Sequence, residues 1–76
     1  MSYQVDWHPI RSEADLPKRG VYLVTWLDKK VSEAECRRYE LRSSRWFTDE
    51  RSFAWDSEDA PIAWALMPEP WEGDKP

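Results

Sequence analysis

The scarcity of crosslinking residues constrains this chain of 76 residues most, since it holds one cysteine, Cys36, and one histidine, His8. A chain this short buries only about 60% of its unfolded surface and is marginally stable unless something reinforces it. One cysteine cannot form a disulfide within the chain, and one Cys with one His does not make a zinc site. The reinforcement must therefore come from large core side chains or from self-association.

Aromatic residues supply the large side chains, with six Trp, three Tyr and two Phe in the sequence. Each such ring buries roughly 150–250 Å², so a few of them replace many aliphatic residues in a small core. We therefore predict a single domain over residues 1–76 with an aromatic core, and a frayed polar tail at residues 72–76. We also predict a homodimer or larger homo-oligomer, which would cover a sheet edge or a second apolar face.

The charge balance excludes several classes of partner. The net charge is −4 and the pI is about 4.9, whereas proteins that bind nucleic-acid backbones or anionic membranes are normally basic. The sequence has no apolar stretch of about 18 residues and no basic segment followed by an apolar one. Together with the lone thiol, this predicts a protein of the reducing cytoplasm, without a membrane partner.

The strongest strand signal lies at residues 21–27, which are β-branched and aromatic and contain neither Gly nor Pro. Both alternating faces are apolar, which predicts a central strand that is covered on both sides. Residues 31–41 are predicted to return as a second strand with Ala34 and Cys36 inward, and a β-bulge would then turn Tyr39 inward. A helix is the alternative for this segment, because Glu, Ala and Arg favour one.

The rest of the chain predicts further short strands. Residues 45–48 are predicted as a third strand, and residues 61–67 as a closing strand whose Trp64 fills the core. Pro68 and Pro70 end the sheet because proline cannot donate a ladder hydrogen bond. The charged residues 49–60 are predicted as a flexible or binding loop.

These segments predict a mainly β fold, with α+β as the alternative. The expected architecture is a small antiparallel meander of about four strands that could curl toward a barrel. It is preceded by an N-terminal arm and contains at most one short helical turn, at Ser12–Asp15, where the two side chains have capping-box spacing.

Short motifs along most of the chain resemble a family of small phage and prophage proteins, domain of unknown function five-five-one. The motifs are Trp7, Ile10, Leu16-Pro17, Gly20 with the following strand, Trp46-Phe47, Trp64 and Met67 to Pro70. The chain departs from the family pattern at Ala63, where a His is frequent, at Ala65-Leu66, and in a longer spacer at residues 12–15. The resemblance implies a phage origin and a small β-rich domain, and it implies no biochemical activity.

No residue pattern predicts catalysis, a metal site or a cofactor. Cys36 lies in a predicted strand between Glu35 and Arg37, which is typical of a small buried residue. A Cys–His nucleophile would also need a third group and an oxyanion hole. Two glycines cannot form a phosphate-binding loop. We therefore predict that the protein is not an enzyme.

Arginine and aromatic residues from position 37 onward are the candidate binding residues. They are Arg37, Arg38, Arg45, Arg51, Phe53, Trp55 and Trp71. Trp, Tyr and Arg dominate protein interfaces, which favours a non-enzymatic protein that binds another protein. The phage origin that the resemblance implies makes it a phage accessory protein with a host protein as partner, for example an anti-CRISPR or similar counter-defence inhibitor. Arginine forks and aromatic faces also suit a small anionic nucleotide signal, so sequestration is the alternative. A structural or virion-associated role is the third, and pairing of the arginines with acidic residues across strands is the purely structural interpretation.

Overall fold

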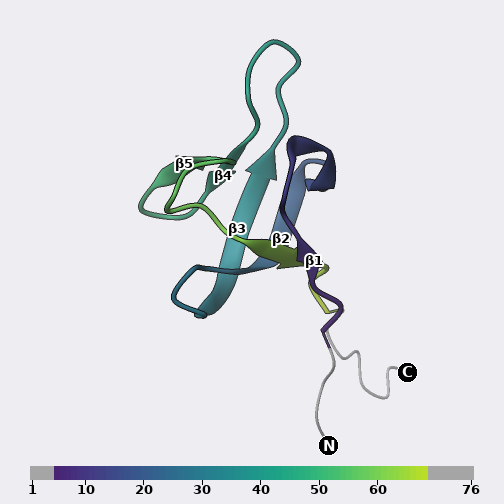
Figure 1. Cartoon of the computed structure of the whole chain (residues 1–76), viewed down its shortest axis with the longest axis vertical. Helices are drawn as coiled ribbons and strands as arrows, with labels where there is room; N and C mark the ends of the chain where they lie inside the picture. Colours follow the sequence, from purple (N-terminus) through teal and green to yellow (C-terminus); the bar gives the residue numbers. More distant parts are fainter. Residues whose placement is uncertain (1–4, 69–76) are drawn as a thin grey trace, which may run out of the picture.

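The computed structural model describes residues 5–68, which form a mainly β domain (Figure 1). It has six strands and one 3-10 turn: β1 (His8–Pro9), η1 (Glu13–Asp15), β2 (Gly20–Thr25), β3 (Val31–Arg37), β4 (Arg45–Phe47), β5 (Ser52–Ala54) and β6 (Ala63–Ala65). The predicted fold class and the single helical turn are confirmed. Trp71 and the tail at 72–76 lie outside the described residues.

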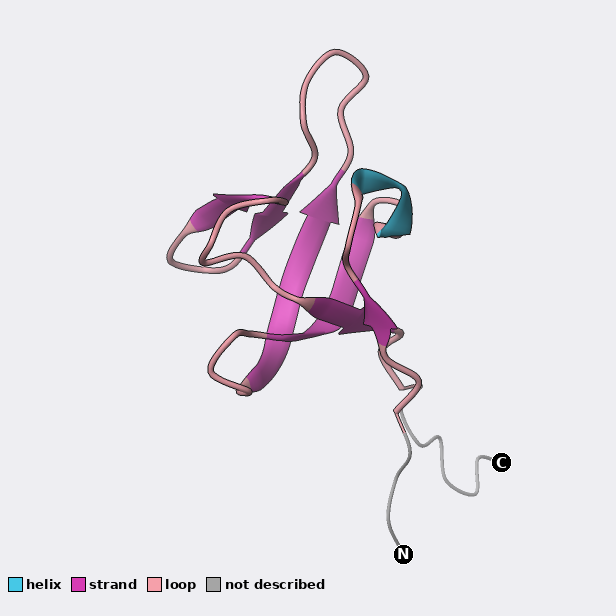
Figure 2. Ribbon diagram, in the orientation of Figure 1, coloured by secondary structure: helices cyan, strands magenta, loops and turns pink. Residues whose placement is uncertain are grey.

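All six strands form one antiparallel sheet in the order β1-β6-β2-β3-β4-β5. Strands β2 to β5 form a meander, and β6 returns to lie between β2 and β1. In Figure 2 the short strands at both ends are turned across the long β2–β3 hairpin. The prediction of about four strands is too low, because β1 lies in the predicted N-terminal arm and β5 lies in segment 49–60, which is predicted as a loop. Within residues 5–68 the end strands β1 and β5 do not pair with each other, so the sheet is not a closed barrel.

The central hairpin pairs β2 with β3 from Gly20 opposite Cys36 to Thr25 opposite Val31. The central position of β2 and the strand at β3 are therefore confirmed. The predicted bulge is wrong, because β3 ends at Arg37 and Tyr39 lies beyond the sheet, 4.2 Å from the Arg42 guanidinium. The Arg38 side chain leaves the ladder here and donates a hydrogen bond to the carbonyl of Leu16.

The core lies on one face of the sheet. Directly paired residues share a face, and the pairing aligns the buried side chains of Tyr22, Val24, Ala34, Cys36, Trp46 and Phe53. Trp64 packs against this cluster, with its ring 5.1 Å from that of Tyr22, so its predicted core position is confirmed. Aromatic side chains therefore provide much of the core volume, as predicted.

The opposite face of the sheet is open to solvent at both ends of the β2–β3 hairpin, although Ala65, which pairs with Leu23 on this face, is only 1% exposed. Val21 on β2 is 54% exposed and Val31 on β3 is 55% exposed. The prediction that both faces of β2 are covered is wrong at Val21 within one copy of the chain, and cover by a second copy stays a prediction. The only helical element of residues 5–68 is η1, and the chain that follows it packs on the core face through buried Leu16, so nothing shields the outer valines.

The core face is closed by the irregular segment 15–18, whose four consecutive carbonyls each accept a side-chain hydrogen bond. The donors are Trp64 to Asp15 (2.7 Å), Arg38 to Leu16 (3.2 Å), Cys36 to Pro17 (3.6 Å) and Tyr22 to Lys18 (2.8 Å). These bonds satisfy backbone groups that have no ladder partner. The segment therefore packs on the sheet without being a strand.

A buried serine joins η1 to the start of β4. Ser44 is fully buried, and its backbone N–H and its Oγ–H both donate to Oε2 of Glu13, at 2.9 and 3.0 Å. The backbone hydrogen bond from Ser44, aided by its hydroxyl, lowers the pKa of the Glu13 carboxyl. Ser44 thus ties the start of β4 to η1, which precedes the segment that covers the core.

Candidate binding surface

A groove of about 540 Å³ lies on the open face, over β2, β3 and the turn after β4. Val21 and Phe47 are its apolar lining residues, and both lie opposite Glu35 in neighbouring strands, which places the three side chains in a row on one face. Val21 remains more than half exposed and Phe47 is partly exposed. The lining therefore has an apolar side chain on each side of Glu35.

Charged side chains of both signs line the groove, but acidic ones predominate. Four carboxylates belong to the lining, those of Glu33, Glu35, Asp49 and Glu50, against the single guanidinium of Arg37. Glu33, Asp49 and Glu50 form no ion pair with any residue between 5 and 68. The potential over the groove is therefore negative and largely uncompensated.

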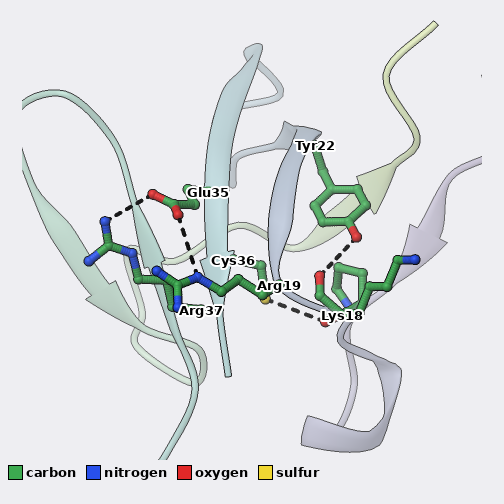
Figure 3. A network of polar contacts seen from close by, with 7 residues as sticks. Lys18, Arg19, Tyr22, Glu35, Cys36 and Arg37 are labelled. Atoms are coloured by element: carbon green, nitrogen blue, oxygen red, sulfur yellow. Dashed lines mark hydrogen bonds and ion pairs between the residues drawn. The ribbon is translucent and has the colours of Figure 1, made fainter. Parts of the chain in front are cut away.

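Arg37 is held by its neighbours in the sheet. Its Nη2 donates to Oε1 of Glu35 at 3.1 Å, and its guanidinium lies 4.1 Å from the centroid of the Phe47 ring. Arg19 approaches the other Glu35 oxygen at 4.0 Å, so Glu35 lies between two guanidinium groups (Figure 3). The hydrogen bond from Arg37 lowers the pKa of Glu35, and the same bond raises the pKa of Arg37. This contact holds the Arg37 guanidinium over the Phe47 ring, as part of the groove wall.

The other predicted arginines are not gathered with Arg37 into one pocket. Arg45 is its direct cross-strand neighbour, but the Arg45 guanidinium donates to Oγ of Ser52. The Arg38 guanidinium donates a hydrogen bond to the Leu16 carbonyl, and Arg51 forms an ion pair with Asp59 at 3.8 Å. Each of the four arginines is thus engaged within the domain.

The predicted aromatic binding residues also lie elsewhere. Phe53 is buried in the core, where its ring is 5.3 Å from that of Trp26, and the Arg51 guanidinium lies 4.8 Å from the Phe53 ring. Trp55 is partly buried and packs against the core cluster. Trp71 lies outside the described residues. A smaller hollow of about 320 Å³ beside Trp26 and Phe53 also carries acidic side chains, including Asp28 and Glu58.

Sequence reasoning missed the groove residues Val21, Phe47, Glu33 and Glu50. One signal for them was present, since Val21 belongs to the second apolar face of the strongest strand while Glu33 and Glu35 alternate with the inward Ala34 and Cys36. Read together, these patterns indicate an apolar strip beside an acidic one on the outer face. The turn residues Asp49 and Glu50 could not be placed without the β4–β5 pairing.

The described residues form no arrangement typical of a catalytic or metal site. Burial raises the pKa of the Cys36 thiol to about 11, and its Sγ donates to the carbonyl of Pro17. His8 stacks on Trp64 with ring centroids 4.5 Å apart. Among residues 5–68, no three His, Cys, Asp or Glu side chains are grouped so that they could hold a metal ion. The same part of the chain contains no helix long and apolar enough to span a membrane.

Comparison with family models, curated proteins and solved structures finds no match to this chain. The resemblance to the phage family stays a prediction.

Proposed function

We propose that this protein acts without catalysis, as a phage accessory protein that binds a host protein through the open face of its sheet. The observation that supports this most is the half-exposed Val21, which lines the groove with Phe47 on the open face, and Val31 is also half-exposed at the other end of the same face of the hairpin. A large apolar surface kept in water costs free energy, and such patches commonly mark interaction sites. The phage origin and the host cytoplasm come from the resemblance and the lone thiol, and a counter-defence role follows from that setting.

The absence of catalysis is supported by the state of the two most reactive side chains. The Cys36 thiol is buried with a raised pKa, whereas nucleophilic cysteines have lowered pKa values and some exposure. The His8 ring is stacked on Trp64 and is distant in the fold from that thiol, since β1 and β3 are separated by β6 and β2. These two positions favour binding over catalysis.

A pull-down from host lysate with matched variants tests the proposal. The test variant is the double Val21→Ser, Val31→Ser, which removes apolar area from the open face without changing charge. The control is Leu41→Ser, because Leu41 is 98% exposed but belongs to the loop between β3 and β4. We expect the wild type and the control variant to capture the same host protein, and the double variant to fail to capture it.

Two results would contradict this assignment of the surface. Capture that the double variant retains, but that Trp55→Ala or Trp71→Ala abolishes, would place the binding site on the aromatic residues predicted from sequence. Stabilisation in a thermal-shift screen of cyclic nucleotides, lost in Arg37→Gln, would favour nucleotide sequestration instead. Light scattering tests the predicted homo-oligomer on the same samples.

A further inference from the structure

We infer that the groove on the open face takes a basic segment of the partner protein, with the stem of a lysine or arginine side chain against Val21 and its charged end among the carboxylates of the groove. This inference rests on the proposed function and adds the chemistry of the partner. A long cationic side chain has an apolar stem and a charged end. The groove offers apolar side chains for the stem and carboxylates around them for the charge.

The charges of the groove favour a cation over any other occupant. Glu35 is already neutralised by Arg37 and Arg19, so Arg37 brings little free positive charge to the groove. Glu33, Asp49 and Glu50 are exposed and form no ion pair within the described residues, which leaves three carboxylates for an incoming ligand. Complementary charge of this kind speeds association and rejects partners of the wrong sign.

A second copy of this chain fits the groove less well than a basic partner. Symmetric pairing of the open faces would bring two sets of uncompensated carboxylates together, and like charges at an interface oppose binding. An anionic ligand meets the same repulsion. The whole chain adds to the effect, because its net charge is −4.

Fluorescence anisotropy with defined peptides tests the inference. The probe is a labelled short peptide of alternating lysine and alanine, and the reference is the same peptide with glutamine in place of lysine. The groove variant removes three carboxylates: Glu33→Gln, Asp49→Asn, Glu50→Gln. The control variant removes three exposed carboxylates away from the groove: Glu40→Gln, Asp56→Asn, Glu58→Gln. Both triple variants change the net charge from −4 to −1. Both also alter turn positions, so their Tm values should agree.

The expected result is binding of the lysine peptide that weakens with salt, and that weakens about tenfold in the groove variant but less than about twofold in the control. Equal weakening in both triple variants, or equal binding of the glutamine peptide, would overturn the inference. So would a dimer seen by light scattering that Val21→Ser, Val31→Ser dissolves.

The captured host protein separates this inference from the proposed function. Capture that needs the two valines but ignores both salt and the groove carboxylates would leave protein binding intact and refute the basic segment. Capture that ignores the valines would refute the proposed surface itself.

Discussion

Matched Val→Ala substitutions on β2 test whether the core is one-sided. Val24 is 0% exposed and Val21 is 54% exposed, although the two lie in the same strand and have the same side chain. Truncating Val24 removes two buried methyl groups at about 0.8 kcal/mol each and leaves a cavity that adds about 1 kcal/mol. We therefore expect Val24→Ala to lower the free energy of unfolding by about 2.5 kcal/mol.

Val21→Ala should cost less than about 1 kcal/mol, because half of that side chain is already in water and no cavity forms. The loss of strand propensity affects both variants equally and cancels in the comparison. For a domain of this size the expected fall in Tm for Val24→Ala is roughly 10–20 °C.

Urea unfolding followed by tryptophan fluorescence, together with thermal melts, measures both values. Equal losses for the two variants would refute the one-sided core, since they would mean that Val21 is covered in solution. If that equality disappeared on dilution, the cover would be a second copy of the chain, as in the form of the predicted homo-oligomer that covers the second apolar face.

Three further predictions concern single groups. With a pKa of about 11 for Cys36, about one thiol in a thousand is ionised at pH 8, so a thiol reagent should label the native protein far more slowly than the urea-unfolded one; equal rates would contradict the buried position. Hydrogen bonds lower the pKa values of Glu13 and Asp15 below their ordinary values, so the ionised carboxylates stabilise the folded state. This stabilisation is present above the unfolded pKa values and is lost as pH falls through the folded ones. Tm should therefore drop below about pH 4, and it should drop less in Glu13→Gln. Trp64→Phe removes the 2.7 Å hydrogen bond to the Asp15 carbonyl and should lower the free energy of unfolding in urea by about 1–2 kcal/mol. Trp55→Phe should lower it less, because the Trp55 indole N–H makes no hydrogen bond among the described residues. The reverse order would show that the bond contributes little.

The strand pattern could be predicted from local sequence, because alternation and β-branched residues act within one segment. The central strand at 20–25, the return strand with Ala34 and Cys36 inward, and the short strands at Trp46 and Trp64 all follow from such patterns. The aromatic core also follows from composition, since a chain with one cysteine and one histidine has no other reinforcement.

The candidate site could not be predicted in the same way, because an arginine-rich segment looks alike whether its side chains bind a ligand or one another. Arg37 belongs to the groove, but Arg38 donates a hydrogen bond to the Leu16 carbonyl and Arg51 forms an ion pair with Asp59. Phe53 is predicted as a binding residue in the loop at 49–60. It is buried instead, because β5 pairs with β4 and places it beside Trp46.

The sequence by itself determined the fold class, the central strand and the aromatic core, since these depend on periodicity and composition along the chain. Only the tertiary structure decided that β6 returns beside β2, that segment 15–18 closes one face through four side-chain donors, and that the other face stays open. These features depend on contacts between residues far apart in sequence, and such contacts leave no local pattern. The acidic groove on the open face is their consequence.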